Sequence, residues 1–202
     1  LMQSYLRTKA GGYDAFRKVL DLHTNSSNNT VYADADGHIA YFHANFLPRR
    51  NPRFDWTKPV DGSDPATEWQ GIHTVEESPN AKDPANGWVQ NTNNWPYSAA
   101  GPASPKVRDY PAYMDQAGES PRGLHAIRVL SNHKGFTIDS LIAAAYDTYL
   151  TGFDELLPPL FAAYRAEPAS SPLKARVAAQ VAALQAWDRR WSVDSVPTAL
   201  AV

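Results

Sequence analysis

The distribution of apolar and polar residues predicts strands in the first part of the chain and helices in the last part. Residues 4–22 repeat apolar side chains at helical spacing, which predicts one amphipathic helix. Residues 29–43, NTVYADADGHIAYFH, alternate on both sides of Asp36-Gly37, which predicts a β-hairpin with a two-residue turn. The first regular structure is therefore expected to be a helix followed by a hairpin.

Residues 45–121 carry eleven of the sixteen prolines and few periodic segments. Four of the six tryptophans also lie there, so the segment is expected to be ordered rather than disordered. A short apolar run predicts one strand at residues 87–91. The rest of this segment is expected to be an irregular lining that covers other parts of the protein.

From residue 136 onward the composition shifts toward alanine and leucine. Thr137 is expected to cap a helix, Pro158-Pro159 to interrupt the next helical pattern, and Ser171-Pro172 to open a last helix. Strands first and helices last indicate the α+β class. We expect residues 1–135 to form a strand and loop part and residues 136–202 a helical part of one incomplete domain.

Composition narrows the possible functions. The formal net charge of the 202 residues is −2, so no strong global field attracts nucleic acid. No apolar run is long enough to span a membrane. Cysteine is absent, which excludes disulfides, thiolate zinc sites and a cysteine nucleophile within these residues.

Three polar patterns need a chemical interpretation. DADGH at residues 34–38 has its glycine too early for a calcium loop, and no glutamate closes the pattern. The six histidines form no i, i+4 pair on a predicted helix, so no zinc site is expected. DGSDPATEW at residues 61–69 could supply paired carboxylates for sugar chemistry, but a capped turn with Trp69 in the core is favoured.

Several segments taken in order resemble the penicillin acylase family. They are NTVYADADGHIAYF, FLPRR, PVDGSDPATEWQG, NGWVQNTNNWP and PRGLHAIRVL. This family contains penicillin G, cephalosporin and acyl-homoserine-lactone acylases, which are N-terminal nucleophile hydrolases. The resemblance implies an interior segment of the nucleophile (beta) chain, within an αββα-type fold, and an enzyme that cleaves an acyl group from a linear amide.

The resemblance also implies two site residues. In NTNN the strand-end asparagine of the family corresponds to Asn93, which would donate its side-chain N–H₂ to the oxyanion, and Asn94 is the rival if the register slips by one residue. Arg122, which opens an R-x5-R-[LV]-L pattern, corresponds to an active-site arginine that would steady the asparagine. Some members bind calcium, for which Pro48 and Asp115 are the nearest matches, but no metal or other cofactor is predicted.

The serine nucleophile of the family is not found in these residues, and Leu1 cannot replace it. The chain alone is therefore expected to be inactive and to need the remaining parts of the acylase, the small chain and the rest of the large chain, as partners. The substrate would be a small-molecule amide, and the resemblance implies a periplasmic or secreted protein. The alternative is a non-catalytic binding module that holds carbohydrate through surface aromatics.

Overall fold

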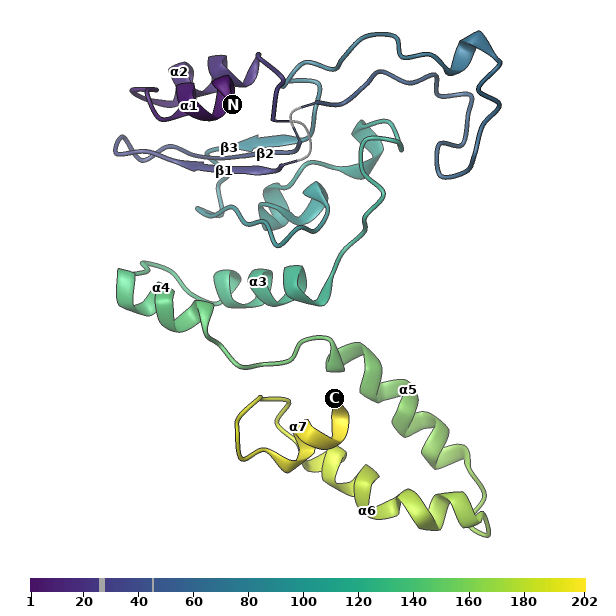
Figure 1. The fold of residues 1–202 in the computed structure, drawn as a ribbon. Helices are drawn as coiled ribbons and strands as arrows, with labels where there is room; N and C mark the ends of the chain where they lie inside the picture. Colours follow the sequence, from purple (N-terminus) through teal and green to yellow (C-terminus); the bar gives the residue numbers. More distant parts are fainter. Residues whose placement is uncertain (26–27, 45) are drawn as a thin grey trace. The chain divides into compact units, whose positions relative to one another are not determined.

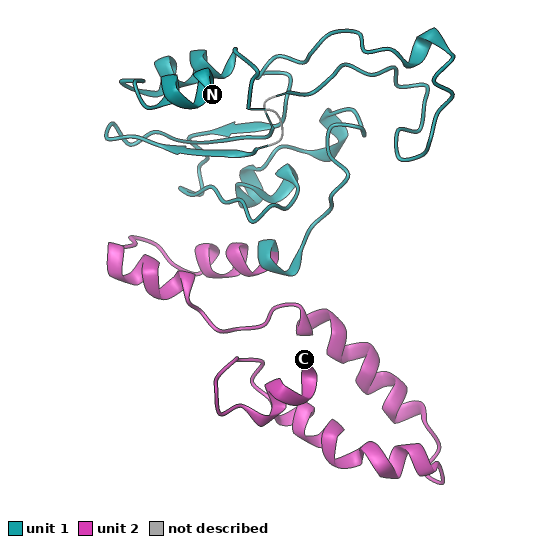
Figure 2. Cartoon of the chain, in the orientation of Figure 1, with its two compact units in different colours: residues 1–123 teal, residues 124–202 magenta. Residues whose placement is uncertain are grey.

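A computed structural model describes residues 1–25, 28–44 and 46–202 and places the chain in the α+β class. The chain divides into two compact units, residues 1–123 and residues 124–202 (Figure 2). This boundary lies earlier in the chain than the 135/136 division that we expect between the strand and loop part and the helical part. Each unit is described by itself below.

Unit 1 is built on a three-stranded antiparallel sheet with the order β1-β2-β3 (Figure 1). The strands are β1 (Thr30–Ala33), β2 (Ile39–Phe42) and β3 (Asn80–Lys82). The predicted hairpin is confirmed as the pair β1 and β2, in which Ala33 lies opposite Ile39. β2 is the central strand, since it also pairs with β3.

The hairpin loop differs from the predicted two-residue turn. Asp34 N donates to His38 O at 3.1 Å, and Gly37 N donates to Asp34 O at 3.3 Å, so three residues lie between the last bonded pair. Gly37 alone in this loop has a positive φ, of 89°. The Asp34 carboxylate accepts from Asp36 N and His38 N, and these bonds favour the longer loop over a turn with two positive φ angles.

The single helix predicted at residues 4–22 is two helices, α1 (Met2–Arg7) and α2 (Tyr13–Leu20). Gly12, which precedes α2, has a φ of 156° and is not helical. Glycine is a poor helix former, and the Gly11-Gly12 pair breaks the periodic pattern that the apolar residues suggest. The break lets α2 turn its aromatic side onto the sheet.

One face of the sheet packs against α2. The core there consists of Leu20, Tyr32, Ala40, Phe42 and Val75, with Tyr13 and Phe16 packed against it. The rings of Phe16 and Tyr32 have centroids 4.7 Å apart. Within the hairpin, Tyr32 faces this core while its neighbour Val31 is 53% exposed, as expected for alternating strand positions.

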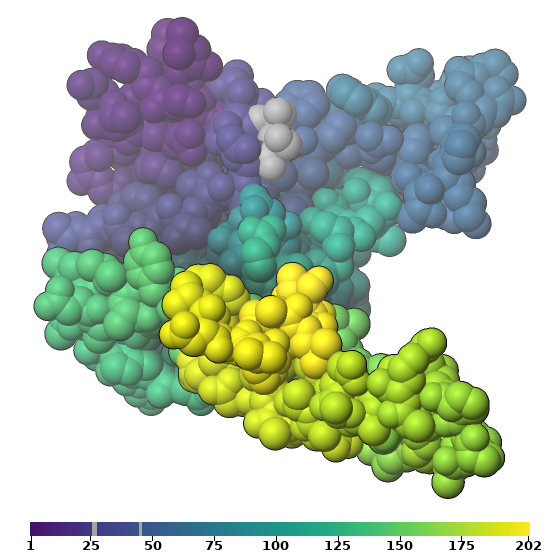
Figure 3. All heavy atoms as spheres, turned by 60° about the horizontal axis from the view of Figure 1, so that its bottom comes forward, coloured from purple at the N-terminus to yellow at the C-terminus, as the bar shows by residue number. Residues whose placement is uncertain are grey.

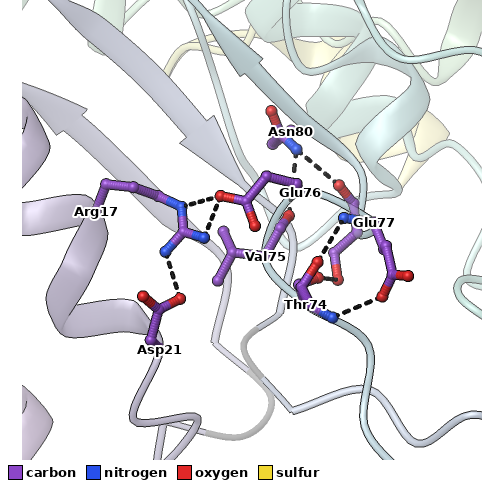
Figure 4. A network of polar contacts seen from close by, with 8 residues as sticks. Arg17, Asp21, Thr74, Val75, Glu76, Glu77 and Asn80 are labelled. Atoms are coloured by element: carbon purple, nitrogen blue, oxygen red, sulfur yellow. Dashed lines mark hydrogen bonds and ion pairs between the residues drawn. The ribbon is translucent and has the colours of Figure 1, made fainter.

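A polar network connects α2 with the segment that precedes β3 (Figure 4). Arg17 pairs with Asp21, the C-cap residue of its own helix, and with Glu76. Next to it, Thr74 N donates to the Glu77 carboxylate at 2.8 Å, and Asn80 Nδ2 donates to Val75 O at 3.2 Å. These bonds hold residues 74–80 in a compact loop and lead the chain into β3.

The proline-rich segment forms short 3₁₀ turns and loops, and residue 45 at its start lies outside the described residues. The turns are η1 (Pro65–Thr67), η2 (Pro96–Ser98), η3 (Gly101–Ala103) and η4 (Val107–Asp109). The strand predicted at residues 87–91 is wrong: the third strand is β3, and Gly87 has a φ of 78° within a turn. Part of this segment covers the other face of the sheet, where Tyr41 is fully buried.

Unit 2 is helical. α3 (Pro121–Ser131) begins at the end of unit 1, and α4 (Ile138–Ala145), α5 (Phe153–Ala166), α6 (Pro172–Ala186) and α7 (Val196–Ala201) follow. The predicted caps are confirmed, because Thr137 forms a capping box with Ser140 and the Ser171 side chain accepts from Lys174 N. α6 and α7 lie side by side (Figure 3).

The predicted interruption at Pro158-Pro159 is wrong. Both prolines lie inside α5, although each lacks the N–H of a helical hydrogen bond. Packing explains why the helix continues: Leu157, Leu184 and Trp187 form a core to which Phe153 and Phe161 are added. The buried contacts on both sides of the two prolines outweigh the two missing bonds.

In the parts of the chain that the structure describes, no helix is both long and apolar enough to cross a membrane.

The core between α2 and the sheet generates a stability prediction. Phe42→Ala should lower the free energy of unfolding by about 3–5 kcal/mol, because it removes a buried ring that packs on Tyr13 and Phe16. Val31→Ala, on the outer side of the same hairpin, should change it by less than about 1 kcal/mol. Urea unfolding of the two variants measures the difference, and equal losses would contradict the assignment of the two faces.

Candidate functional site

The Asn91–Asn94 segment is a turn held by its own side chains. Asn91 Oδ1 accepts from Asn93 N at 3.2 Å, and Asn94 Oδ1 accepts from Thr92 N at 3.0 Å. Asn91 Nδ2 in turn donates to Asn94 O at 3.3 Å. Side-chain amides thus replace the backbone ladder that a strand would supply, which explains why several asparagines lie together here.

Asn93 is at the exposed tip of this turn, with a φ of 63°. Asparagine tolerates this left-handed conformation better than most residues. Its Oδ1 accepts from both Nη1 and Nη2 of Arg122, each at 3.4 Å. The structure thus brings the two site residues inferred from the family resemblance together, 29 positions apart in the chain.

The contact with Arg122 orients the Asn93 amide. Because the oxygen faces the guanidinium, the Nδ2 group points away from it and has no hydrogen-bond partner among the described residues. A cation at the amide oxygen also polarises the amide and strengthens its N–H groups as donors. Asn93 therefore presents a neutral, polarised donor.

Asn94 has a different environment. It is 3% exposed, and its Nδ2 donates to Ser98 Oγ at 3.1 Å and to Glu119 Oε1 at 2.9 Å. Its oxygen is engaged with Thr92, as described above. Both ends of the Asn94 amide are therefore used inside the protein, which makes it a structural residue of the turn.

Glu119 is a residue that sequence reasoning missed. Among the described residues its carboxylate accepts from Asn94, from Trp95 Nε1 at 3.1 Å, from Ser98 Oγ and from Ser120 N at 2.7 Å. A Cβ on Gly123 would lie 2.1 Å from Glu119 Oε1, so only glycine lets the helix pack this closely. The glycine in the sequence SPRG was the available signal for a close approach.

A polar cavity of about 570 Å³ lies beside the turn, within unit 1. Most of its lining side chains are polar, and six of them are asparagines. The described lining residues are Arg7, Asn25, Asn28, Asn29, Thr30, Val31, His43, Asn91, Asn93, Asn94 and Asp115. Its volume is in the usual range for small-molecule sites, so a polar ligand of that size fits beside Asn93.

His43 and Asp115 form the buried side of this cavity. His43 Nε2 lies 3.2 Å from Met114 O and 3.5 Å from Asp115 Oδ2, and its Nδ1 lies 3.3 Å from Tyr41 Oη. The Met114 carbonyl can only accept, so Nε2 carries the proton of a neutral ring and Nδ1 accepts from the Tyr41 hydroxyl.

Burial determines the ionisation of this group. It lowers the pKa of His43, against the opposing effects of the Met114 carbonyl and of Asp115. Burial also raises the pKa of Tyr41, and together with the Asp115 charge it raises the pKa of Tyr97 to about 12. At neutral pH the buried side of the cavity therefore has a neutral imidazole at His43, and the phenols of Tyr41 and Tyr97 near Asp115 are un-ionised.

The two residues nearest to the calcium pattern of the family have other contacts in this structure. Pro48 pairs with Ile72 in an isolated β-bridge, whereas Asp115 faces His43 and accepts from Ala117 N. No group of three or more His, Cys, Asp or Glu side chains that could hold a metal is found in the described part of the chain.

The acidic segment at residues 61–69 is a capped turn, as favoured. Asp61 accepts from Ser63 N at 2.9 Å, and Asp64 caps η1 by accepting from Ala66 N at 2.8 Å. The expectation that Trp69 is in the core is wrong, because it is 56% exposed beside Phe46. The two aspartates act as local caps, and Asp64 also pairs with Arg53.

The His43 network predicts a pH dependence of stability. An unfolded histidine titrates near pH 6.5, and the pKa of folded His43 is lower. Between these two values the unfolded state binds more protons, so His43 favours unfolding as the pH falls below about 6.5. His43→Gln should keep the hydrogen bonds to Tyr41 and Met114 without this titration.

Urea unfolding from about pH 7.5 to about pH 5.5 measures the difference. The wild type should lose more stability than His43→Gln over that range. Burial lowers the pKa of His73 as well, with Arg49 acting in the same direction, and that contribution is common to both proteins. Parallel pH profiles would contradict the buried, neutral state of His43.

Comparison with known proteins places the chain in a family. The family model of penicillin amidase matches residues 1–202. The chain is 33% identical over 84 residues to a penicillin G acylase of Escherichia coli, which covers 42% of this chain and 9% of that protein. A solved structure, a thermostable penicillin G acylase from Alcaligenes faecalis, is similar in fold with a TM-score of 0.66 at 24% identity, over 95% of this chain and 32% of that chain.

The chain thus spans about a third of the length of that solved relative. The family match extends over the whole chain, and the fold similarity extends over nearly all of it. The chain belongs to the penicillin amidase family.

Proposed function

We propose that this chain is an interior segment of the nucleophile (beta) chain of a penicillin-acylase-like amidohydrolase, which cleaves an acyl group from a linear amide. Membership of the penicillin amidase family supports the reaction class. Both relatives described above are penicillin G acylases, so an amide of this kind is the first substrate class to test.

The arrangement of Asn93 and Arg122 carries the proposal. Hydrolysis of an amide passes through a tetrahedral intermediate with a negatively charged oxygen, and a neutral donor that is already in place stabilises it. Asn93 offers such a donor beside a polar cavity, and the Arg122 fork holds the other end of its amide. Asn94 is the weaker choice, since its amide is buried and bonded to Ser98 and Glu119.

The rest of the chemistry would come from outside these residues. An N-terminal serine would attack the carbonyl carbon with its oxygen, and its own α-amine would accept the proton and pass it to the leaving amine. Asn93 Nδ2 would donate to the oxygen that becomes negative. Arg122 acts as a positioning residue, because it touches Asn93 rather than the reacting atoms.

The same proposal covers the setting of the chain. Residues 1–135 and 136–202 would belong to one incomplete domain of an αββα-type N-terminal nucleophile hydrolase fold. The small chain and the rest of the large chain would be its partners, a small-molecule amide its substrate, and the periplasm or the cell exterior its location.

A carbohydrate-binding module is the alternative, and the aromatic residues do not favour it. Such a module needs aromatic rings side by side on an open face. Among the described residues, the aromatic side chains that are more than half exposed are Trp69 at 56%, Trp191 at 54%, Tyr5 at 58% and Tyr146 at 79%. No ring contact joins any two of these four. Trp95 instead donates to Glu119 inside unit 1.

The first prediction concerns Asn93 in the complete acylase. Asn93→Ala should lower kcat by roughly 10²–10³, about 2.7–4 kcal/mol, with little change in KM, because the lost donor acts in the transition state. Asn93→Gly should lose as much. Glycine accepts the positive φ at this position without strain, so this variant separates the donor from the backbone effect.

Two checks make this measurement decisive. Processing of each variant is verified first, because chain cleavage would pass through a similar oxyanion. Asn51→Ala, which alters an asparagine turn elsewhere in unit 1, serves as the control and should keep its activity. Fully processed Asn93→Gly enzyme that retains more than about half of the wild-type kcat would refute the proposed role.

The second prediction concerns the 202-residue chain by itself. Its first residue, Leu1, offers no hydroxyl or thiol beside an α-amine, so no nucleophile of the proposed kind is present. The purified chain should hydrolyse phenylacetyl, glutaryl and acyl-homoserine-lactone amides no faster than buffer does. Turnover above background that survives Asn93→Ala would point instead to a different catalytic group within the chain.

A further inference from the structure

The contact between Asn93 and Arg122 orients the amide, but it is too weak to hold the two segments that carry these residues in place. Both hydrogen bonds are 3.4 Å long, which is longer than the usual range of about 2.7–3.2 Å, and both side chains are exposed. A shift of well under 1 Å would break them. The two residues also belong to different segments, the Asn91–Asn94 turn and the first turn of α3. Something else must hold these segments together.

Glu119 connects the two segments. One side of its carboxylate network reaches the chain just after Asn93, through Asn94 Nδ2 at 2.9 Å and Trp95 Nε1 at 3.1 Å. The other side reaches the start of α3, where Ser120 N donates at 2.7 Å. The backbone adds a parallel link, since Trp95 N donates to Gly118 O at 3.2 Å. We call this set of contacts the Glu119 hub.

The Glu119 hub also determines how closely α3 can approach the asparagine turn. Ser120 Oγ accepts from Gly123 N at 3.2 Å and caps α3, and this brings Gly123 against the hub. A Cβ at position 123 would lie 2.1 Å from Glu119 Oε1 and 2.4 Å from Asn94 Nδ2. The first turn of α3, which carries Arg122, is therefore packed directly on the side chains that hold the asparagine turn.

A carboxylate has a specific advantage at this position. All four groups that reach Glu119 among the described residues are used as donors, and an ionised carboxylate is an acceptor only. A glutamine of the same shape would place an N–H₂ group against at least one of them. The hydroxyl of Ser98 can rotate to accept, but the indole N–H of Trp95 cannot.

We propose that Glu119 is a positioning residue of the acylase site, which fixes Asn93 and Arg122 relative to each other through the Glu119 hub. This inference rests on the function proposed above for Asn93. Glu119 touches neither Asn93 nor Arg122 in the described hydrogen bonds, and its oxygens are occupied within the hub. It acts by holding the turn and α3, and not by contact with substrate.

Glu119→Gln in the complete, processed acylase tests the proposal. It should lower kcat by about 10- to 100-fold with little change in KM, because a displacement of about 1 Å at a transition-state donor has that effect. In an Asn93→Gly background the same change should cost almost nothing more, since the group that it positions is already gone. A structural defect alone would not produce this non-additivity.

Gly123→Ala is an independent test of the same hub. Alanine is a better helix former than glycine, so it should not weaken α3 itself. It should nevertheless lower kcat in the same direction, because its Cβ displaces Glu119 or Asn94. The matched control is Gly62→Ala, where a Cβ meets nothing within 4 Å and where kcat should stay unchanged.

A second control matches the chemistry of the Glu119 change. Glu77→Gln alters a carboxylate that also accepts several hydrogen bonds, from Arg49 and Thr74, far along the chain from the turn. It should leave kcat and KM as in the wild type. If Glu119→Gln is not processed, Trp95→Phe removes one donor from the hub and keeps the carboxylate, and it should show the same non-additivity with Asn93→Gly.

The outcomes separate the two proposals. If Asn93→Gly is inactive but Glu119→Gln and Gly123→Ala keep the wild-type kcat, the positioning role is refuted and the function of Asn93 stands. If Glu119→Gln and Asn93→Gly have additive effects, the positioning role is also refuted. If Asn93→Gly keeps its activity, the proposed function itself fails.

Discussion

The burial of β2 on both faces is the constraint on which the rest of unit 1 depends. Ala40 and Phe42 face the core that α2 covers, while Tyr41 between them is fully buried on the other face. In a three-stranded antiparallel sheet with a helix on one face, the other face is normally exposed to solvent. Here part of the proline-rich segment covers that side, and this packing orders the segment although its regular structure is limited to β3 and short 3₁₀ turns.

The covering segment brings polar chemistry to the sheet. Tyr41 reaches His43, and His43 reaches Met114 and Asp115 from the far end of the proline-rich segment. The cavity beside the asparagine turn is built against this wall. The chain therefore forms a polar cavity by folding an irregular segment over a small sheet. Asn93 lies on a turn of that segment, and Arg122 lies in the first turn of α3, which follows it.

The parts of the fold that could be predicted are those specified by short-range contacts. Thr137 and Ser171 bond to amides a few residues away, and the hairpin pairs neighbours in sequence, so each left a local pattern. The predictions were wrong where contacts between residues far apart in the sequence determine the local structure. Pro158 and Pro159 remain helical because α5 packs on Trp187, and no local rule signals that packing.

The candidate site shows the same division. The resemblance to a family pointed to Asn93 and Arg122, and the structure adds that they are hydrogen-bonded to each other. Glu119 could not be found from its neighbours, because its partners Asn94, Trp95 and Ser98 lie more than twenty positions away. In the sequence, a glutamate with an exposed carboxylate cannot be distinguished from one whose carboxylate accepts several hydrogen bonds.

The left-handed backbone at Asn93 has a consequence for reading related sequences. A φ of 63° is readily accepted by glycine, asparagine and aspartate, and it disfavours other residues whatever the protein does. Among these three, only asparagine has a side-chain N–H donor. A relative that has lost its chemistry but kept its fold can therefore drift to glycine or aspartate here, whereas an active one retains asparagine. The residue type at the position of Asn93 would then distinguish relatives that are active from relatives that only fold.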